Sequence, residues 1–257
     1  MPEGDTVWQT ARRLHEALAG KTLTRFELRV PRQAMLDLTG QTVREVAPRG
    51  KHLLLRAGEF TLHSHLKMEG VWDVHPAGAR WRRPAHTARA ILAADGVEAV
   101  GFDIAQVQVV PTRDEHALVG YLGPDPLQPD WEPETAAKNL AADPRPIHVA
   151  LLDQRNLAGL GNEYVNEVLF VRGIHPQTKA SEVDTAALVE TAARMLRANR
   201  DRPVRTFTGD ARRGRDRWVY RREHQPCRRC GRLIERTELG ADPTQERIVF
   251  WCPNCQR

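Results

Sequence analysis

Hydrophobic residues near the N-terminus recur with the spacing of an amphipathic helix. The apolar positions lie three or four residues apart, which places them on one helix face. They are Val7, Ala11, Leu14 and Leu18. Because Gly20 follows and glycine commonly ends helices, the pattern predicts a helix from about Asp5 to just before Gly20.

After Gly20 the pattern changes to alternation of apolar and polar residues, which is typical of half-buried strands. Glycine, proline and aspartate separate the alternating segments. Strands are predicted at residues 22–30, 41–46, 52–55, 61–65, 87–92 and 97–102. Short strands at this spacing predict a β-sandwich or barrel, with the first helix packed against one end.

From Val107 to Pro133 the chain is rich in proline, and this composition predicts a linker between domains. Helical periodicity then returns in further segments. They cover residues 134–142, 147–153, 162–172 and 180–199. A turn containing Gly159 and Gly161 precedes Asn162, which can cap the third of these helices or help its N-terminus to bind phosphate.

The composition is that of a soluble globular protein, with 41% hydrophobic and 28% charged residues in a chain of 257. One to three domains are expected at this length. There is no apolar run long enough to span a bilayer, and charge from Glu3 onwards argues against a signal peptide. We therefore expect a cytoplasmic protein.

Positive charge is concentrated at the C-terminal end. Residues 194–257 contain 17 arginines, no lysine and 8 acidic residues, a net charge of +9, so the rest of the chain carries −4. This distribution favours a polyanionic partner, with nucleic acid first among the candidates. Only five of the 38 basic residues are lysines, so an arginine-biased genome is the alternative explanation.

All four cysteines lie in the last 31 residues, as two Cys-x-x-Cys pairs separated by 21 residues. They are Cys227, Cys230, Cys252 and Cys255. Four thiolates at this spacing favour a structural zinc site over a disulfide or a redox pair. Between the pairs, residues 233–239 and 247–251 alternate as two strands of a hairpin that would present Arg247.

The first residues combine a nucleophile with a proton carrier. If Met1 is removed, Pro2 carries a free amine whose pKa of about 7.7–8 leaves part of it unprotonated at neutral pH. Such an amine can attack an aldehyde-like carbon to form an iminium, and Glu3 could transfer the protons. A Met-Pro start is also common in cytosolic proteins, so this segment alone is weak evidence.

Two turns carry further candidates. Arg49-Gly50-Lys51 opens a strand, and glycine there allows close approach of a ligand to the backbone beside the Lys51 ammonium. Residues 64–70 follow another strand and place Met68 next to Lys67. From the pattern alone, Met68 is interpreted as a core residue.

Several short motifs along the chain together resemble the formamidopyrimidine-DNA glycosylase/endonuclease VIII family, from residue 2 to residue 256. The motifs are Met1-Pro2-Glu3-Gly4, Arg49-Gly50-Lys51, Leu122-Gly123-Pro124, Leu151-Leu152-Asp153-Gln154 with Leu157-Ala158-Gly159-Leu160-Gly161-Asn162, Gly173-Ile174-His175-Pro176 and Cys252-Pro253-Asn254-Cys255-Gln256. The resemblance implies a mixed α+β chain of several domains. These are an N-terminal catalytic β-sandwich at residues 1–121, a linker at 122–133, a helix–two-turn–helix DNA-binding domain at 134–222 and a zinc finger at 223–257.

The resemblance also implies the function, a bifunctional DNA glycosylase and abasic-site lyase of base excision repair. Pro2 resembles the nucleophile that attacks C1′ of the damaged nucleotide, and Glu3 the group that moves protons during ring opening and β,δ-elimination. Lys51, Asn162 and Arg247 match positions that hold phosphates around the flipped-out nucleotide, and Lys51 is also counted with Pro2 and Glu3 among the catalytic residues. Met68 matches a residue that fills the gap in the base stack, so the resemblance replaces the core interpretation.

The endonuclease VIII branch fits better, because Gly4, Gly70-Val71-Trp72 and Phe102-Asp103-Ile104 resemble it. This branch implies oxidised pyrimidines as substrates. One departure is Thr6, where the family often has an acidic residue; Asp5 lies one place early and points elsewhere. We expect a monomer with one structural zinc that binds damaged or abasic DNA in a bacterial nucleoid. Oxidised purines as substrates, or a silent DNA-binding homologue, are the alternatives.

Overall fold

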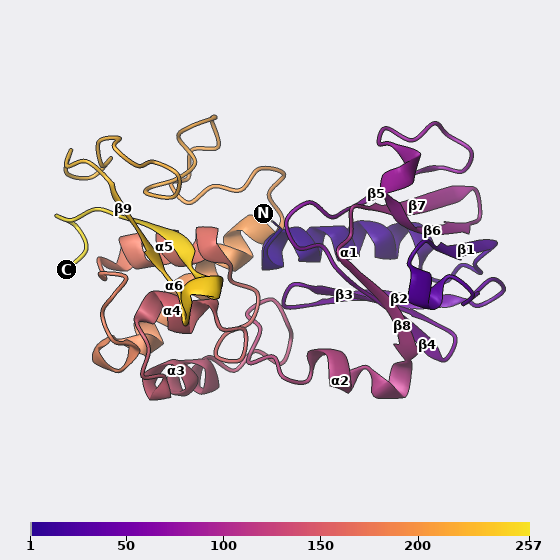
Figure 1. Ribbon diagram of the computed structural model, residues 1–257, viewed down its shortest axis with the longest axis horizontal. Helices are drawn as coiled ribbons and strands as arrows, with labels where there is room; N and C mark the ends of the chain where they lie inside the picture. The colour runs from indigo at the N-terminus through magenta and orange to yellow at the C-terminus, as the bar shows by residue number, and fades with distance from the viewer. Residues whose placement is uncertain (1) are drawn as a thin grey trace. The chain divides into compact units, whose positions relative to one another are not determined.

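The computed structural model describes residues 2–257, except for the side chains of Arg32 and Pro243. The predicted removal of Met1 concerns a residue that lies outside the described residues. The chain divides into two compact units, residues 1–121 and residues 122–257 (Figure 1).

The first unit is a sandwich of two antiparallel four-stranded sheets, with strand orders β1-β6-β7-β5 and β2-β3-β4-β8. The strands are β1 (Arg25–Leu28), β2 (Val43–Arg49), β3 (His52–Ala57), β4 (Phe60–His65), β5 (Val71–Pro76), β6 (Ala88–Ala94), β7 (Val97–Phe102) and β8 (Gln106–Pro111). The short helical turns η1 (Pro31–Gln33) and η2 (Ala85–Thr87) lie between strands, whereas η3 (Thr112–Asp114) and α2 (His116–Val119) follow β8. The predicted sandwich is confirmed.

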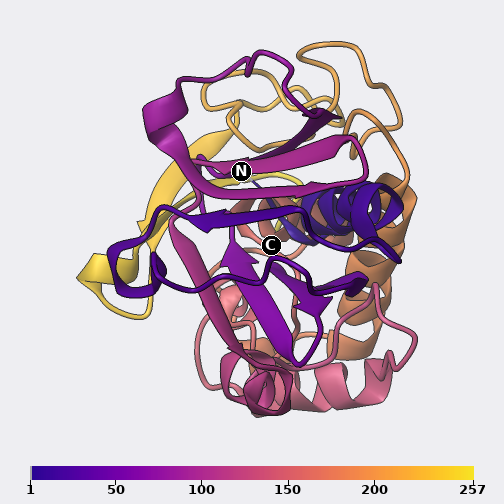
Figure 2. The same cartoon turned by 90° about the vertical axis from the view of Figure 1, so that its right-hand side faces the viewer.

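The predicted first helix is α1 (Gly4–Leu18), which lies beside the strands (Figure 2). Its apolar face, including Val7, Leu14 and Leu18, is buried in the main core of this unit together with residues of both sheets. The helix packs against β2, β3, β5 and β7. Burial of this face fixes the position of its N-terminus, where Pro2 and Glu3 lie.

The strand predictions miss β5 and β8 and extend β1 too far. Strand β8 was included in the proline-rich segment, yet Val109 alternates with glutamines and is buried in the core. Pro111 ends this strand, and proline at the end of a strand is compatible with pairing. Strand β8 pairs with β4 over its whole length.

The second unit begins with helices around a separate core. They are α3 (Pro133–Ala142), α4 (Ile147–Leu152), α5 (Asn162–Arg172) and α6 (Thr185–Arg200), with the turn η4 (Ala180–Glu182) before α6. The side chain of Asp184 accepts a hydrogen bond from the Ala187 backbone, which explains why α6 begins later than predicted. Residues 162–170 of α5 are all buried.

Residues 201–234 contain neither helix nor strand in the described chain and are followed by a hairpin. Its strands are β9 (Glu235–Leu239) and β10 (Arg247–Trp251), joined through η5 (Pro243–Gln245). Phe170 of α5 packs with Val219, Ile234 and Phe250 in a small core of this region. The predicted hairpin is therefore present, with a slightly shorter first strand.

The segment predicted as a linker is partly packed on the second unit. The Gly123 backbone N–H donates to the Gln154 carbonyl, and the Ala158 N–H donates to the Pro124 carbonyl. A Cβ at Gly123 would lie 2.1 Å from the Arg155 carbonyl oxygen, so only glycine fits at this contact. The further division of the second unit at residues 222/223 stays a prediction.

Candidate functional site

The first candidate group lies at the N-terminus of α1. Glu3 is the N-cap residue in an extended conformation and is fully buried, while Pro2 is half-buried. The Glu3 carbonyl accepts the Val7 N–H at 3.0 Å, which begins the helix. A carboxylate and an amine at this place both experience the positive end of the helix dipole.

The acidic residue after Glu3 is turned back onto the helix. Asp5 is 2% exposed, and its Oδ1 accepts the Thr6 N–H at 2.7 Å and the Thr6 hydroxyl at 3.3 Å. The Thr10 hydroxyl in turn donates to the Thr6 carbonyl. Thr6 therefore takes part in hydrogen bonds within α1, and Asp5 is its direct partner.

Lys51 lies in the two-residue turn between β2 and β3, half-buried. Gly50 precedes it with φ +56°, a conformation that favours glycine and is used at the first position of tight hairpin turns. Arg49 and His52 are the last paired residues on either side. The turn therefore fixes the backbone of Lys51 at the end of a regular hairpin.

Met68 is exposed, with 56% of its surface accessible, so the interpretation as a core residue is wrong. Leu66 is buried instead and anchors the segment between β4 and β5. Lys67 has φ +54°, and the Gly70 N–H donates to the Leu66 carbonyl at 3.0 Å. This tight turn interrupts the strand periodicity, so the alternation does not apply to Met68.

Asn162, the first residue of α5, is 8% exposed and uses its amide inside the second unit. Its Nδ2 donates to the Ile248 carbonyl at 2.8 Å, and its Oδ1 lies 3.0 Å from His148 Nε2. Burial lowers the pKa of His148 to about 4, so this imidazole is neutral and donates from Nε2. The Asn162 amide thus connects α4 and α5 to β10, the strand that begins with Arg247.

Asn166, one turn later, reinforces the same connection. Its Oδ1 accepts the Phe250 N–H at 2.6 Å, and its Nδ2 donates to the Asn162 carbonyl at 2.6 Å. Arg247 itself is exposed, and its Nη1 donates to the Glu246 carbonyl. Two asparagines on one helix face therefore hold the strand that presents this arginine.

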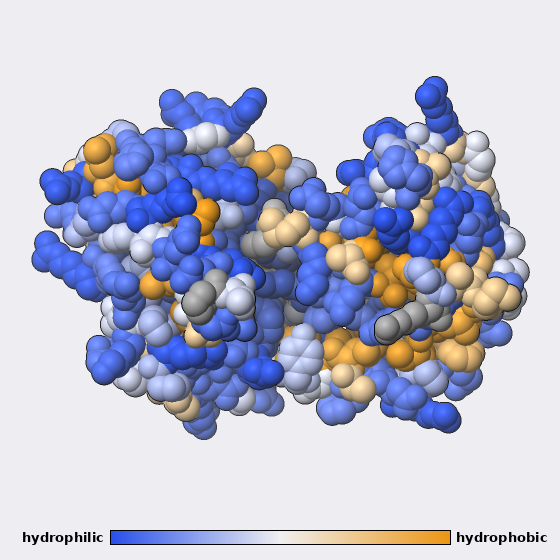
Figure 3. Space-filling view, viewed as in Figure 1, coloured by the Kyte–Doolittle hydropathy of each residue, from blue (hydrophilic) through white to orange (hydrophobic). Residues whose placement is uncertain are grey.

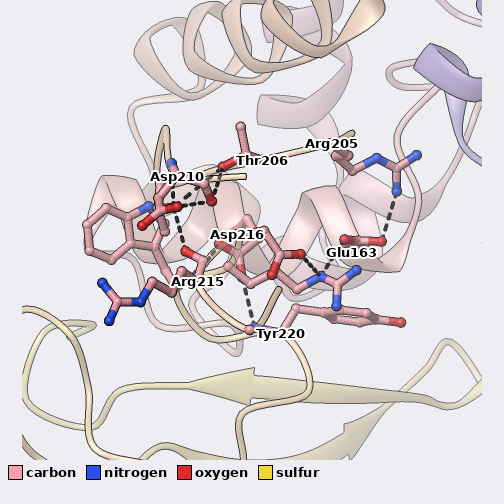
Figure 4. A network of polar contacts seen from close by, with 12 residues as sticks. Glu163, Arg205, Thr206, Asp210, Arg215, Asp216 and Tyr220 are labelled. Atoms are coloured by element: carbon pink, nitrogen blue, oxygen red, sulfur yellow. Dashed lines mark hydrogen bonds and ion pairs between the residues drawn. The ribbon is translucent and has the colours of Figure 1, made fainter. Parts of the chain in front are cut away.

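Two glutamates of α5 bind the loop that precedes the hairpin, and Figure 4 shows one of them, Glu163, with Arg205. Glu163 accepts from Arg205 at 2.8 Å and from Arg217 at 2.7 Å, and is 3% exposed. Glu167 is fully buried and accepts three consecutive backbone N–H groups at residues 218–220, at 2.8–2.9 Å. Sequence reasoning missed these roles, although polar residues at 162, 163, 166 and 167 in an otherwise apolar helix are a detectable signal.

The four cysteines meet at one place in the second unit. Their Sγ atoms all lie within 4.8 Å of one another, and Sγ–Sγ distances are 3.4 Å for Cys230–Cys252 and 4.0 Å for Cys227–Cys255. A tetrahedral zinc with Zn–S bonds of about 2.3 Å needs sulfurs roughly 3.8 Å apart. The geometry fits zinc, and all four thiols are unbridged.

Polar contacts around the cysteines support the same geometry. The Arg229 N–H points to Cys227 Sγ at 3.4 Å, and Gly231, with φ +79°, donates to the Cys227 carbonyl. Gln256 accepts the Cys252 N–H at 2.9 Å and donates to the Ile174 carbonyl at 2.9 Å. These contacts connect the cysteine cluster to the end of α5.

The basic C-terminal part is largely exposed. Its accessible arginines include Arg212, Arg213, Arg215, Arg221, Arg228 and Arg232. The face over this region is mostly hydrophilic (Figure 3). No helix in the described part of the chain is long and apolar enough to cross a membrane.

The predicted residues are thus distributed over the two units. The first unit holds Pro2, Glu3, Lys51 and Met68. The second holds Asn162, Arg247 and the four cysteines, and the Asn162 amide contacts the strand of Arg247 directly.

Models of two protein families match the chain. Residues 1–109 match the formamidopyrimidine-DNA glycosylase N-terminal domain, and residues 122–200 match the formamidopyrimidine-DNA glycosylase H2TH domain. Together they cover residues 1–200 apart from residues 110–121.

Similar proteins cover the chain from end to end. It is 53% identical to a probable endonuclease 8 2 of Streptomyces coelicolor, over 100% of this chain and 94% of that protein. It is 50% identical to the DNA-(apurinic or apyrimidinic site) lyase Nei2 of Mycolicibacterium smegmatis, over 100% and 99%. The structure of Lactococcus lactis Fpg with abasic-site DNA has the same fold, with a TM-score of 0.83 and 24% identity over 99% of each chain.

Proposed function

Because the chain belongs to the formamidopyrimidine-DNA glycosylase and endonuclease VIII family, we propose that it removes oxidised pyrimidines from DNA and cleaves the strand at the abasic site. It is a DNA glycosylase and abasic-site lyase of base excision repair. The observation that carries this proposal is the Pro2-Glu3 pair at the N-terminus of α1, with Glu3 fully buried.

Pro2 supplies the nucleophile in this proposal. The lone pair of its amine forms a bond to C1′, and the glycosidic bond breaks with its electron pair leaving on the base. The proline nitrogen then gives up its proton, and the C1′–O4′ bond breaks as O4′ takes up a proton, which leaves an iminium between the nitrogen and C1′. This iminium acidifies the C2′ hydrogens, so the 3′ phosphate departs by β-elimination. A second, δ-elimination releases the 5′ phosphate and leaves a one-nucleotide gap.

Glu3 transfers protons in these steps. Ring opening requires a proton on the sugar oxygen, and elimination requires a proton to be taken from C2′. The burial of this carboxyl, one peptide bond from the nucleophile, supports the assignment. The helix N-terminus disfavours protonated Pro2, which helps to keep part of the amine reactive.

Lys51, Asn162 and Arg247 hold phosphates next to the flipped-out nucleotide, and Met68 fills the gap in the base stack. The exposure of Met68 and of Arg247 supports these roles. The Asn162 side-chain nitrogen has two hydrogens. One is donated to the Ile248 carbonyl, and the phosphate contact would use the second. In this assignment residues 134–222 and 223–257 are the DNA-binding domain and the zinc finger.

We further propose one structural zinc on the four cysteines. All four positions of the tetrahedron would be filled by the protein, so the metal would hold the hairpin of Arg247 and take no part in the reaction. The close approach of the four Sγ atoms supports this assignment.

Zinc removal is expected to loosen the hairpin and weaken DNA binding, because ligation adds directly to local folding. Elemental analysis should give one zinc per chain. Chelation should then lower affinity for a duplex with a tetrahydrofuran abasic-site analogue and increase amide exchange in β10. Absence of zinc, or undiminished DNA binding after its removal, would contradict the proposal.

Borohydride trapping on a panel of damaged duplexes tests the proposed function. We expect a covalent adduct with duplexes that carry an oxidised pyrimidine or an abasic site. Duplexes with an oxidised purine should react more slowly, and undamaged DNA should give no adduct. Faster trapping on an oxidised purine would reverse the substrate assignment, and binding without any trapping would identify a silent DNA-binding protein.

A further inference from the structure

Three histidines lie on the outer face of the sheet β2-β3-β4-β8. On β3 and β4, Leu53, Leu55 and Leu62 point into the sandwich core. Successive strand residues point to opposite faces, so His52, His63 and His65 share the other face. His52 lies directly opposite His65, and His63 lies opposite Gln108 of β8.

Hydrogen bonds connect His63 and His52 to each other and each of them to one further residue, so that four side chains form a row. Gln108 Nε2 lies 3.3 Å from His63 Nδ1, His63 Nε2 lies 2.7 Å from His52 Nδ1, and His52 Nε2 lies 3.1 Å from the Tyr121 hydroxyl. An amide nitrogen only donates, so His63 accepts at Nδ1 and donates from Nε2. The same reasoning gives His52 a proton on Nε2, which donates to Tyr121.

This order requires neutral imidazoles, and the surroundings favour them. His52 is 7% exposed and His63 is 2% exposed. Burial is the main cause that lowers the pKa of His52 to about 3, and electrostatic interactions with His65, His63, Lys67 and Lys51 act in the same direction. Burial also lowers the pKa of His63 to about 4, against the opposite effect of Glu115.

The row ends beside both turns that carry the DNA-binding candidates of this unit. His52 directly follows Lys51, and its ring packs edge-on against His65 with centroids 4.8 Å apart. His65 Nδ1 accepts the Lys67 N–H at 3.1 Å, in the turn that contains Met68. Leucines would fill this face at a lower desolvation cost, but they could not provide these directional contacts.

We propose that the row Gln108–His63–His52–Tyr121 positions Lys51 for its phosphate contact. The hydrogen bonds fix the rotamer of His52, and through it the turn Arg49–His52. This inference rests on the proposed function, in which Lys51 binds a phosphate. His52 and His63 are thus positioning residues that do not touch the substrate.

A double-mutant cycle on DNA binding tests the row. We would measure the affinity of the full-length protein for a tetrahydrofuran-containing duplex over a range of salt concentrations. The variants are Lys51→Ala, His63→Leu and their combination, with exposed His86→Leu as the matched control. Tyr121→Phe removes only a hydroxyl from a half-exposed ring and serves where His63→Leu folds poorly.

Lys51→Ala is expected to lower the salt slope by about one phosphate contact. His63→Leu removes its hydrogen bonds to both Gln108 and His52, and it should weaken binding roughly three- to tenfold and lower the same slope. It should add little to Lys51→Ala, because both changes remove one interaction. His63→Gln keeps a donor and an acceptor and should restore most of the affinity.

Three results would overturn the inference in distinguishable ways. Additive losses for Lys51→Ala and His63→Leu, or for Lys51→Ala and Tyr121→Phe, would show that the row does not act through Lys51. A normal salt slope with a lower melting temperature for His63→Leu would likewise reduce the row to a structural role. An unchanged salt slope for Lys51→Ala would show that Lys51 does not contact a phosphate, and the row would then have no contact to position. Borohydride trapping at Pro2 would still report the glycosylase and lyase chemistry separately.

Discussion

A Glu3→Gln variant is expected to lose base removal while it keeps much of its cleavage at ready-made abasic sites. Glutamine has nearly the same shape as the buried Glu3 but carries no transferable proton. General acid–base catalysis contributes about 10²- to 10⁴-fold, so excision of an oxidised pyrimidine should fall within that range. An existing abasic site has no base to expel, and its open-chain aldehyde needs no ring opening. Its cleavage therefore loses only the transfer of the C2′ proton and should fall less. Gel assays of both substrates under single-turnover conditions measure the two steps.

Pro2→Gly is the matched comparison. It keeps an N-terminal amine but changes the basicity and placement of the nucleophile, so trapping should fall on both substrates, by about 10²-fold for a displacement near 1 Å. Affinity for DNA should be unchanged. If Glu3→Gln excises the damaged pyrimidine as fast as the wild type, another acid must be found. A fully active protein whose intact mass retains Met1 would exclude Pro2 as the nucleophile.

The fold could be predicted from the sequence wherever one face of an element is apolar. The amphipathic pattern of α1 and the alternation in β3, β4 and β7 gave these elements nearly their observed bounds. The cysteine spacing predicted the cluster, because two Cys-x-x-Cys pairs at the two ends of one hairpin bring the four thiols together. Strand β5 was missed. Its exposure alternates, but Trp72 is its only fully buried residue.

The site was predicted less completely, because periodicity describes which residues are buried and not what they contact. Asn162 was predicted as a helix cap or phosphate ligand, but no pattern revealed that its amide reaches Ile248, which is 86 residues away in the sequence. The same holds for Glu163 and its two arginines. Long-range pairing of polar groups depends on the tertiary structure. The sequence shows only that four polar residues occur in a helix whose other residues are mostly apolar, and it does not show their partners.

The histidines on β3 and β4 illustrate the same limit. Alternation places His52, His63 and His65 on one face, yet it equally allows that face to be exposed. The structure buries it under residues 112–121, where Glu115 accepts from Arg56 and Thr61 and Tyr121 contacts His52. Neutral buried imidazoles are consequently a property of the fold, and they determine how the protein responds to acid.

We expect the protein to lose stability steeply as the pH falls below about 6.5. In the unfolded chain a histidine titrates near pH 6.5, whereas burial lowers the pKa of His52 to about 3 and of His63 and His65 to about 4. Below pH 6.5 the unfolded state therefore binds protons that the folded state excludes. Each such histidine costs about 1.4 kcal/mol of unfolding free energy per pH unit until the pH reaches its folded pKa.

Other groups change stability in different windows or with the opposite sign. Hydrogen bonds from Arg145 lower the pKa of Asp143 to about 2. The stability that this carboxylate contributes is therefore lost only as the pH falls from its ordinary value of about 4 towards 2, below the range in which the histidines destabilise the fold. Burial raises the pKa of Glu167 to about 7, against its three N–H donors, and this group favours folding as the pH falls from 7 towards 4.5. This gain in unfolding free energy offsets the loss caused by about one histidine, so the protein still loses stability as the pH falls.

Comparison of the wild type with His63→Gln separates the contribution of His63 to the pH dependence of stability from the contributions of the other titrating groups. Urea unfolding of both proteins between pH 7 and pH 5 gives the free energy of unfolding at each pH. Because glutamine cannot take up a proton, the variant should lose about 1.4 kcal/mol less per pH unit below pH 6 than the wild type does. His86→Gln, at an exposed position on η2, is the control for the histidine-to-glutamine change itself. Equal slopes for wild type and His63→Gln would mean that His63 is already protonated in the folded protein, which is incompatible with its place between Gln108 and His52.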